Sequence, residues 1–253
     1  MNQSVGKALK LLGLFTAERS RLSLADIARS SGLSKPTAYR LLKALEEEGF
    51  LVRNQVDHGD KQYQLGLRLL ELGNLVAEQL EVRKIALPYM ERLRDELNEV
   101  VHLVIRERSE AVYVERVETD RPMRLFTRIG LRTPLHAGSA PRLLLAYTPE
   151  PEREALLQQI KLERFTDDTI TEIDKLQRVL AEIRERGYAI SFGEHVAGTL
   201  GVSTPIRDHT GSVIASLTIA VPGDHFPEER IQLLIVRLKE TAEEISRRCG
   251  YVP

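Results

Sequence analysis

Hydrophobic residues recur every three to four positions along the first fifty residues, which is the spacing of amphipathic helices. The pattern predicts three helices, at residues 4–18, 23–31 and 34–49. Ser23 and Ser34 stand at the expected N-cap positions, where a serine hydroxyl accepts a bond from a free backbone amide. Gly32 allows a tight turn between the second and third helices, because glycine adopts left-handed backbone angles at little cost.

Two short hydrophobic segments follow, at residues 50–52 and 63–65, and a polar loop separates them. They are predicted to pair as a β-hairpin with a long tip. Three short helices followed by a hairpin form the outline of a winged helix-turn-helix. Residues 1–65 are therefore predicted to be a winged helix-turn-helix DNA-binding domain.

The third predicted helix has an apolar inner face and a polar outer face. Ala38, Leu41, Leu42 and Leu45 make the inner face. On the outer face, Lys and Arg can neutralise phosphates or reach guanine edges, and hydroxyl groups can bond to phosphates or bases. The residues expected to contact DNA are Ser34, Lys35, Pro36, Thr37, Tyr39, Arg40, Lys43 and, in the hairpin, Lys61.

On periodicity alone, a small helical domain whose charged face is only solvated is an equal alternative to a DNA-binding domain. The short second helix and the Ser-Lys-Pro-Thr helix start favour DNA binding.

Residues 66–81 return to a helical pattern that is more apolar than a flexible linker, so a linker helix that packs against another surface is predicted. Residues 82–253 then mix the helical and the strand periods. The predicted helices lie at residues 82–97, 172–186 and 227–248, with a further helix entered from a loop within 134–147. The predicted strands lie at residues 100–106, 111–117, 123–127, 188–192, 201–206 and 212–221. This order predicts an α+β domain with a sheet flanked by helices.

Composition excludes several classes of protein. Hydrophobic residues make up 42% and charged residues 29% of the chain, which indicates packed cores rather than disorder. The one cysteine, Cys249, rules out an intramolecular disulfide and a Cys-rich metal site, and the six histidines show no metal-binding spacing. Charges interrupt every apolar run before about 18 residues, and no signal peptide is recognisable. A cytoplasmic protein with no metal and no membrane contact is expected.

The net charge of −1 hides a weak asymmetry along the chain. Residues 1–67 carry ten Lys and Arg against seven Asp and Glu, whereas the remainder carries 26 against 30. A mildly basic N-terminal part is compatible with nucleic acid binding without demonstrating it.

Nine short segments, in order along the chain, resemble the IclR family of transcription regulators. They are VGKALKLL (5–12), LADIA (24–28), GLSKPTAYRLL (32–42), LEEEGF (45–50), YQLG (63–66), PLHA (134–137), LLLA (143–146), GYAIS (187–191) and PIRDHTG (205–211). The resemblance spans nearly the whole chain, so it is more specific than a single helix-turn-helix match. It implies a GAF-like effector-binding domain at residues 82–253, operator DNA and a small-molecule effector as partners, and assembly as a homodimer or a dimer of dimers. It implies no cofactor.

The helix start at residues 136–140 is the first candidate for effector binding. Its small side chains let a ligand approach backbone amides, and Ser139 adds a hydroxyl. The candidates in this segment are His136, Ala137, Gly138, Ser139 and Ala140. The family resemblance adds Leu125, Thr133, Glu194, Thr199, Gly201, Thr218 and Ala220. Without the resemblance, a capped helix start with a structural His136 would be the simpler explanation.

Two departures from the family pattern bear on the effector. Pro141 and Arg142 replace the Gly-Lys that the family usually has there, and Gly201 replaces a polar or thiol residue. Gly201 makes room but offers no hydrogen bond. We therefore expect an organic acid that is bulkier or less polar than a two- or three-carbon keto acid.

Two other classes of function are alternatives for this sequence. An enzyme could use His136 with Ser139, or Glu194 with His195, but the segment lacks the second glycine of a G-x-S-x-G elbow. Cys249 alone offers no redox pair. No catalytic residue and no enzymatic activity are therefore expected.

The second alternative is a protein-interaction module that has lost DNA binding, but such a module would not need the basic outer face of the third helix. Activation or repression, and dimer or tetramer, stay open.

Overall fold

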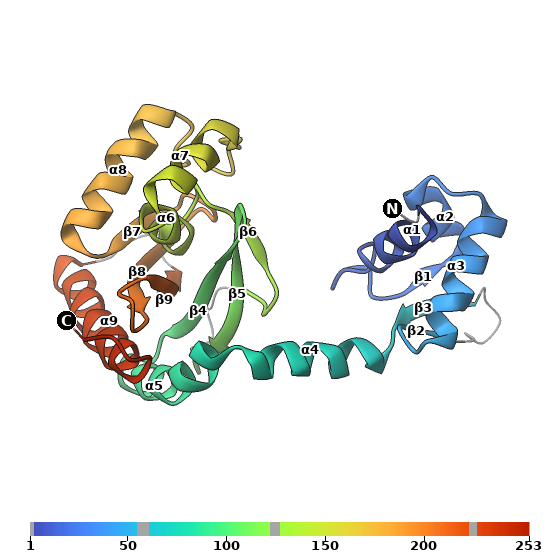
Figure 1. Ribbon diagram of the computed structural model, residues 1–253, viewed down its shortest axis with the longest axis horizontal. Coiled ribbons are helices and arrows are strands. Elements are labelled where there is room, and N and C mark those ends of the chain that lie inside the picture. The colour runs from blue at the N-terminus through green and yellow to red at the C-terminus, as the bar shows by residue number, and fades with distance from the viewer. Residues whose placement is uncertain (1–2, 55–60, 122–126, 223–226, 253) are drawn as a thin grey trace. The chain divides into compact units, whose positions relative to one another are not determined.

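The computed structural model describes residues 3–54, 61–121, 127–222 and 227–252. The chain divides into two compact units, Met1–Gln79 and Leu80–Pro253, each with its own hydrophobic core (Figure 1). Within the described residues, none of the helices combines the length and apolarity that a membrane crossing requires.

The first unit is a winged helix-turn-helix, as predicted. Its elements are α1 (Gln3–Leu12), β1 (Leu22–Ser23), α2 (Leu24–Ser31), α3 (Lys35–Glu47), β2 (Leu51–Asn54), β3 (Gln62–Leu65) and α4 (Leu67–Gln79), and the sheet order is β1-β3-β2. The side chains of Leu11, Ile27 and Leu42 are almost fully buried between the three helices. Tyr63, on strand β3 of the hairpin, is also buried and packs in this core.

Two details of the first unit differ from the prediction. The first helix ends at Leu12 and not near residue 18. Glycine at position 13 lowers helix propensity, and the amides of Leu14 and Phe15 form turn bonds to carbonyls three residues back (3.2 and 3.3 Å). The two-residue strand β1 was not predicted, because a strand this short shows no periodicity.

The second unit contains a six-stranded antiparallel sheet with the order β6-β5-β4-β9-β8-β7. Its elements are α5 (Glu81–Leu97), β4 (Val100–Glu107), β5 (Glu110–Val117), β6 (Arg132–Pro134), α6 (Ser139–Ala146), α7 (Glu150–Gln159), α8 (Ile173–Arg186), β7 (Ala189–Phe192), β8 (Thr199–Arg207), β9 (Val213–Pro222) and α9 (Glu228–Arg248). Helices α5 and α9 cover one face, and α6 and α8 lie on the other (Figure 1). The predicted α+β class is confirmed.

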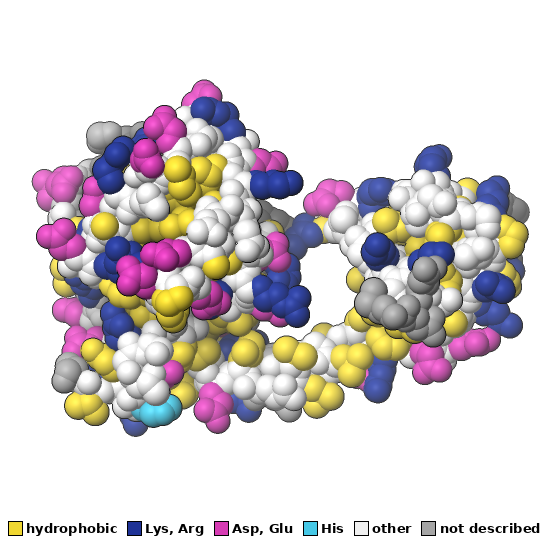
Figure 2. Space-filling view, turned by 45° about the horizontal axis from the view of Figure 1, so that its top comes forward, with side chains coloured by type: hydrophobic (Ala, Val, Ile, Leu, Met, Phe, Trp, Pro, Cys, Tyr) yellow, Lys and Arg dark blue, Asp and Glu magenta, His cyan; other side chains and the backbone are white. Residues whose placement is uncertain are grey.

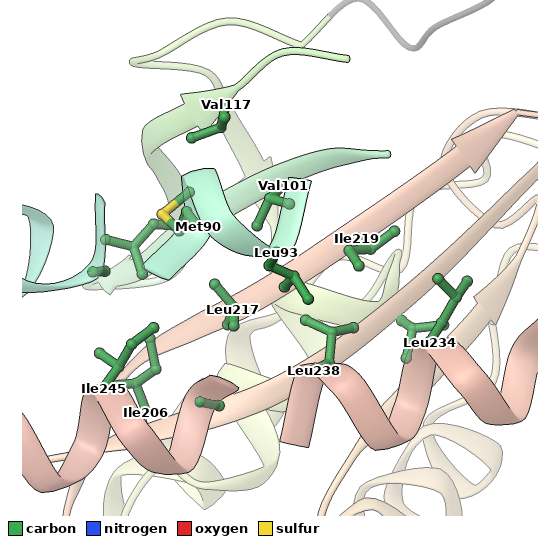
Figure 3. Close-up of a cluster of buried hydrophobic side chains, with 14 of the residues drawn as sticks. Met90, Leu93, Val101, Val117, Ile206, Leu217, Ile219, Leu234, Leu238 and Ile245 are labelled. Atoms are coloured by element: carbon green, nitrogen blue, oxygen red, sulfur yellow. The ribbon is translucent and has the colours of Figure 1, made fainter. Parts of the chain in front are cut away.

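Side-chain alternation along the strands divides the residues between the two faces. Val101 points toward α5 and α9, where Leu217 and Leu238 join it (Figure 3). Leu103 belongs to the same cluster. Each such buried leucine stabilises the fold by about 1.5 to 3 kcal/mol. His102 lies between Val101 and Leu103 on β4 and therefore points to the opposite face.

Two elements of the second unit were not predicted. Strand β6 lies partly in a segment expected to be a loop, and α7 had no predicted counterpart. None of the α7 residues is fully buried, so this helix has only a weak apolar stripe to reveal it. The strand expected at 123–127 falls almost entirely outside the described residues, and Thr127 is not in a strand.

Candidate functional site

The outer face of α3 is arranged as predicted. Ala38 and Leu42 are fully buried, whereas Arg40 and Lys43 are exposed and Tyr39 is 39% exposed. Lys43 forms only an exposed ion pair with Glu47 (3.5 Å), which restrains it weakly. A basic, hydrogen-bonding surface thus lies on the exposed side of the helix that follows the tight turn.

The start of α3 corrects one expectation. Ser23 does cap α2, since its hydroxyl accepts a bond from the amide of Asp26 (3.2 Å). Ser34 does not cap α3 with its side chain; its hydroxyl donates to the Thr37 hydroxyl (2.9 Å), and its carbonyl accepts from the amide of Ala38 (2.9 Å). Lys35 and Pro36 are exposed in the first turn. Lys61 is exposed and immediately precedes β3.

The second unit holds a cavity of about 460 Å³ between its sheet and the start of α6. Its lining residues are His102, Tyr113, Thr127, Leu131, Thr133, Ala137, Gly138, Ser139, Ala140, Ser191, His195, Val196, Thr199, Leu200, Gly201, Thr218 and Ala220. We call it the effector cavity. Strand register explains part of the lining, because His102 pairs with Thr218 and Gly201 pairs with Ala220, and these two positions of β9 are two residues apart and so face the same side of the sheet.

The α6 end of the cavity is built from small residues and hydroxyls. Gly138 precedes the helix with φ of 97°, a backbone conformation that favours glycine. The Ser139 hydroxyl accepts a bond from Ser203 (2.8 Å), which in turn bonds to Thr218 (2.9 Å). Because Ser139 already accepts from within the protein, its own proton is available to a ligand.

Gly201 provides space at this end. A Cβ atom at this position would lie 2.6 Å from the Ser139 Oγ and 2.9 Å from the Ser191 Oγ. Any side chain here would therefore displace both hydroxyls from their places beside the cavity.

Strands β4, β5 and β6 contribute His102, Tyr113 and Thr133 to the cavity lining. His102 Nε2 bonds to the Thr127 hydroxyl, and the Tyr113 ring meets the His102 ring edge-on with centroids 5.4 Å apart. Burial, reinforced by the charge of Arg116, lowers the pKa of His102 to about 3, so this side chain is neutral at physiological pH. Within the described part of the chain, the buried His102 Nδ1 and Thr133 Oγ1 have no hydrogen-bond partner.

Nine of the predicted effector residues line the cavity: Thr133, Ala137, Gly138, Ser139, Ala140, Thr199, Gly201, Thr218 and Ala220. His136 and Glu194 lie behind it. His136 is fully buried, bonds through Nε2 to the carbonyl of Glu163 (2.9 Å) and stacks on Phe165, as a structural histidine does. Leu125 lies outside the described residues.

Glu194 is held in a buried ion pair. Its carboxylate lies 2.8 Å from Arg142, and both side chains are at most 10% exposed. It also accepts a bond from the amide of Gly138 (3.2 Å), while Arg142 donates to the carbonyl of Ile190 (2.6 Å). Burial raises the pKa of Glu194, and the charge of Arg142 opposes that rise. The pair therefore ties the loop after β7 to the start of α6.

Sequence reasoning missed eight lining residues: His102, Tyr113, Thr127, Leu131, Ser191, His195, Val196 and Leu200. A signal existed for His102, which interrupts an otherwise apolar strand and so stands on the face opposite the main core. The others reach the cavity through strand pairing and loop conformation, which periodicity does not show. Among the described residues, no group of three His, Cys, Asp or Glu side chains is placed to hold a metal ion.

A helix-turn-helix unit joined to a unit with a ligand-sized cavity is the organisation of an effector-responsive transcription regulator. Residues 4–55 match the IclR helix-turn-helix domain and residues 74–247 match the bacterial transcriptional regulator IclR C-terminal domain. The chain belongs to the IclR family.

Similar proteins support this family assignment over the full length. The chain is 38% identical over 250 residues to the HTH-type transcriptional regulator KipR of Bacillus subtilis, covering 99% of this chain and 98% of that protein. Its structure resembles the Thermotoga maritima IclR with a TM-score of 0.81, at 33% identity, covering 99% and 100% of the two chains. It resembles an IclR homologue of Microbacterium hydrocarbonoxydans complexed with 4-hydroxybenzoate with a TM-score of 0.83, at 30% identity, covering 97% and 98%. This chain is accordingly a DNA-binding transcription regulator with an effector-binding C-terminal domain, and the family is one of regulators rather than enzymes.

Proposed function

We propose that this protein binds operator DNA through the outer face of α3 and the hairpin, and that an organic acid in the effector cavity controls this binding. The observation that carries the effector assignment is the cavity itself, about 460 Å³ in volume and lined by buried hydrogen-bonding atoms that lack a protein partner among the described residues. Unpaired buried polar groups are unfavourable, so a ligand that bonds to them is stabilised. The protein is proposed to act in the cytoplasm.

Three features favour an acid of moderate size. The N-terminus of α6 lines the cavity, and the amides of Ser139 and Ala140 in its first turn have no partner within the helix, whereas the amide of Gly138 is bound to Glu194. Ser139 can add a donated hydrogen bond, and the buried polar atoms of His102 and Thr133 can bond to a second polar group. The Microbacterium homologue is complexed with 4-hydroxybenzoate, an acid with polar groups at both ends. We therefore propose a carboxylate larger than a two- or three-carbon keto acid.

Titration calorimetry with carboxylates of increasing size tests the effector assignment. A ring-sized or branched acid should bind more tightly than glyoxylate or pyruvate, because a larger acid fills more of the cavity and carries more groups that can bond to its polar lining. Binding by the smallest acids alone would overturn the size assignment. Binding should not change between pH 5 and 9 through His102, whose pKa of about 3 keeps it neutral there.

Gly201→Val should weaken effector binding strongly while leaving DNA binding intact. Valine brings a Cβ to within 2.6 Å of the Ser139 Oγ and fills part of the cavity, although the surrounding sheet can retain its pairing. Calorimetry should show at least a tenfold loss of affinity, about 1.4 kcal/mol, while a gel shift without effector should match the wild type. Unchanged effector affinity would show that the ligand binds elsewhere.

Arg40→Ala should lower operator affinity by about 1 to 3 kcal/mol and relax the preference for one base pair, if its guanidinium bonds to a base edge in the major groove. Gel shifts on the operator and on variants with single base-pair changes measure both effects. The exposed surface lysine Lys161, in the second unit, supplies a control substitution that should change neither. An equal loss on every sequence would place Arg40 on a phosphate instead.

We further propose that the protein acts as a homodimer or dimer of dimers. Leu67, Leu70, Leu75 and Val76 expose large apolar areas along α4, which Figure 2 shows as hydrophobic side chains on its surface. A second copy that covers these side chains would bring two α3 helices to successive turns of the major groove. Effector binding would then act by shifting an equilibrium between dimer geometries. Sedimentation of the protein with and without effector measures this assembly.

A further inference from the structure

The side chains that line the effector cavity are electrically neutral at pH 7. Among the described lining residues there is no lysine, arginine, aspartate or glutamate. Burial keeps His102 neutral, with a pKa of about 3, and raises the pKa of Tyr113 to about 12. Burial, together with the charge of His136, lowers the pKa of His195, so this ring is also predominantly neutral. The described lining therefore contains no counter-ion for a charged ligand.

Two arginines lie close behind the lining, and each is already paired with a carboxylate. Arg142 lies 2.8 Å from Glu194. Arg116, whose charge acts on His102, lies 2.8 Å from Glu118. Each pair combines one positive and one negative charge, so neither arginine adds a net positive charge beside the cavity.

The start of α6 can stabilise one negative charge in the cavity. The amides of Ser139 and Ala140 lie in its first turn, where amides have no partner within the helix, and both residues line the cavity. The polar atoms elsewhere in the lining are of another kind. His102 Nδ1 and Thr133 Oγ1 are buried without a partner among the described residues, and they are suited to a hydroxyl, carbonyl or amide group. They carry no charge that could balance a second carboxylate.

We propose that the effector cavity selects a monocarboxylate whose other polar groups are uncharged, and that it excludes dicarboxylates of the same size. A carboxylate that leaves water without a counter-ion is strongly destabilised, and such a group takes up a proton instead. A dicarboxylate would therefore bind only with one of its two groups protonated. This inference rests on the proposed effector binding and narrows the chemical class of the ligand.

Titration calorimetry with ligand pairs of nearly equal shape tests this selection. Terephthalate and its monoamide share one ring and one carboxylate, and they differ in a second carboxylate against an uncharged amide. Adipate and its monoamide form the matching aliphatic pair. At pH 7 about one in 500 carboxyl groups with a pKa near 4.3 is protonated. The monoamide of the better-fitting pair should therefore bind at least about 100-fold more tightly than the dicarboxylate. Equal affinities, or tighter binding of the dicarboxylate, would overturn the proposal.

The pH dependence of binding separates charge from shape. Between pH 8 and 6, the affinity for terephthalate should rise about tenfold for each unit by which the pH falls, because only the singly charged form binds. The affinity for the monoamide should stay constant by comparison, since its one carboxylate is ionised throughout. His102 and Tyr113 do not titrate in this range, and any titration of His195 affects both ligands alike. An affinity ratio of the two ligands that does not change with pH would contradict the proposal.

Val196→Lys supplies the missing counter-ion. Val196 lines the cavity and is 49% exposed, so a lysine there can keep its ammonium group in contact with water. The variant should reduce the preference for the monoamide over the dicarboxylate at least tenfold. Val196→Gln, the uncharged control, should leave the preference unchanged, and thermal unfolding checks that both variants fold. A lysine variant that behaves like the glutamine control would count against selection by charge.

The same titrations separate this inference from the proposed function. If neither member of either pair binds, the organic-acid effector itself fails. If both members of a pair bind alike, the acid effector stands and only the selection by charge fails.

Discussion

Replacing Glu194 by alanine should lower the free energy of unfolding of the second unit by about 3 to 5 kcal/mol. The substitution leaves the guanidinium of Arg142, only 2% exposed, without its carboxylate partner 2.8 Å away. It also removes the acceptor for the amide of Gly138 at the start of α6. An uncompensated buried charge is far more costly than the loss of a surface ion pair. Urea denaturation followed by circular dichroism measures the change.

Two control variants separate charge from packing. Glu243→Ala breaks an ion pair with Arg247 in which both side chains are about half exposed, and it should change stability by less than about 0.5 kcal/mol. The double variant Arg142→Met/Glu194→Leu removes both buried charges and should recover most of the lost stability. If the double variant is as unstable as Glu194→Ala, shape and not charge explains the effect.

The position of Glu194 shows that the sequence alone did not fully predict which residues line the effector cavity. The family resemblance placed Glu194 among the effector contacts, yet it lies behind the cavity lining and pairs with Arg142, a residue noted only as a departure from the family pattern. The two residues are 52 positions apart and meet through the fold, so neither spacing nor periodicity joins them. Whether Glu194 also affects the effector stays a prediction.

The helical parts of the fold could be predicted because their signals are local. In α3, the buried residues Ala38, Leu42 and Leu45 recur at helical spacing. The segment Ser34-Lys35-Pro36 marks the start of this helix, since Ser34 is its N-cap and Pro36 lies in its first turn. Strand β6 and helix α7 were missed, since one is three residues long and the other buries no residue fully.

The effector cavity could be predicted in part. Small residues at and just before the start of α6, together with the family pattern on β6, β8 and β9, identified nine lining positions. His102 and Tyr113 were missed, because they reach the cavity only through the pairing of β4 with β5 and β9. Their contribution depends on which strands are neighbours, and a single sequence does not fix that order.

Replacing Leu42 by alanine should lower the free energy of unfolding of the first unit by about 2 to 5 kcal/mol and abolish operator binding. Leu42 is fully buried on the inner face of α3, where it packs with Ile27 and Leu11. The loss comes from removed apolar contact and from the cavity left behind. For a domain of this size, such a loss is a large share of the total stability.

The second unit should be unaffected by Leu42→Ala, because it has a separate core. Effector binding measured by calorimetry should therefore persist while gel shifts show no complex. Glu47→Ala, on the exposed side of the same helix, is the matched control and should keep both the fold and DNA binding within about 0.5 kcal/mol of the wild type. Simultaneous loss of effector binding in Leu42→Ala would mean that the two units unfold together, so that their cores are energetically coupled despite being formed from different parts of the chain.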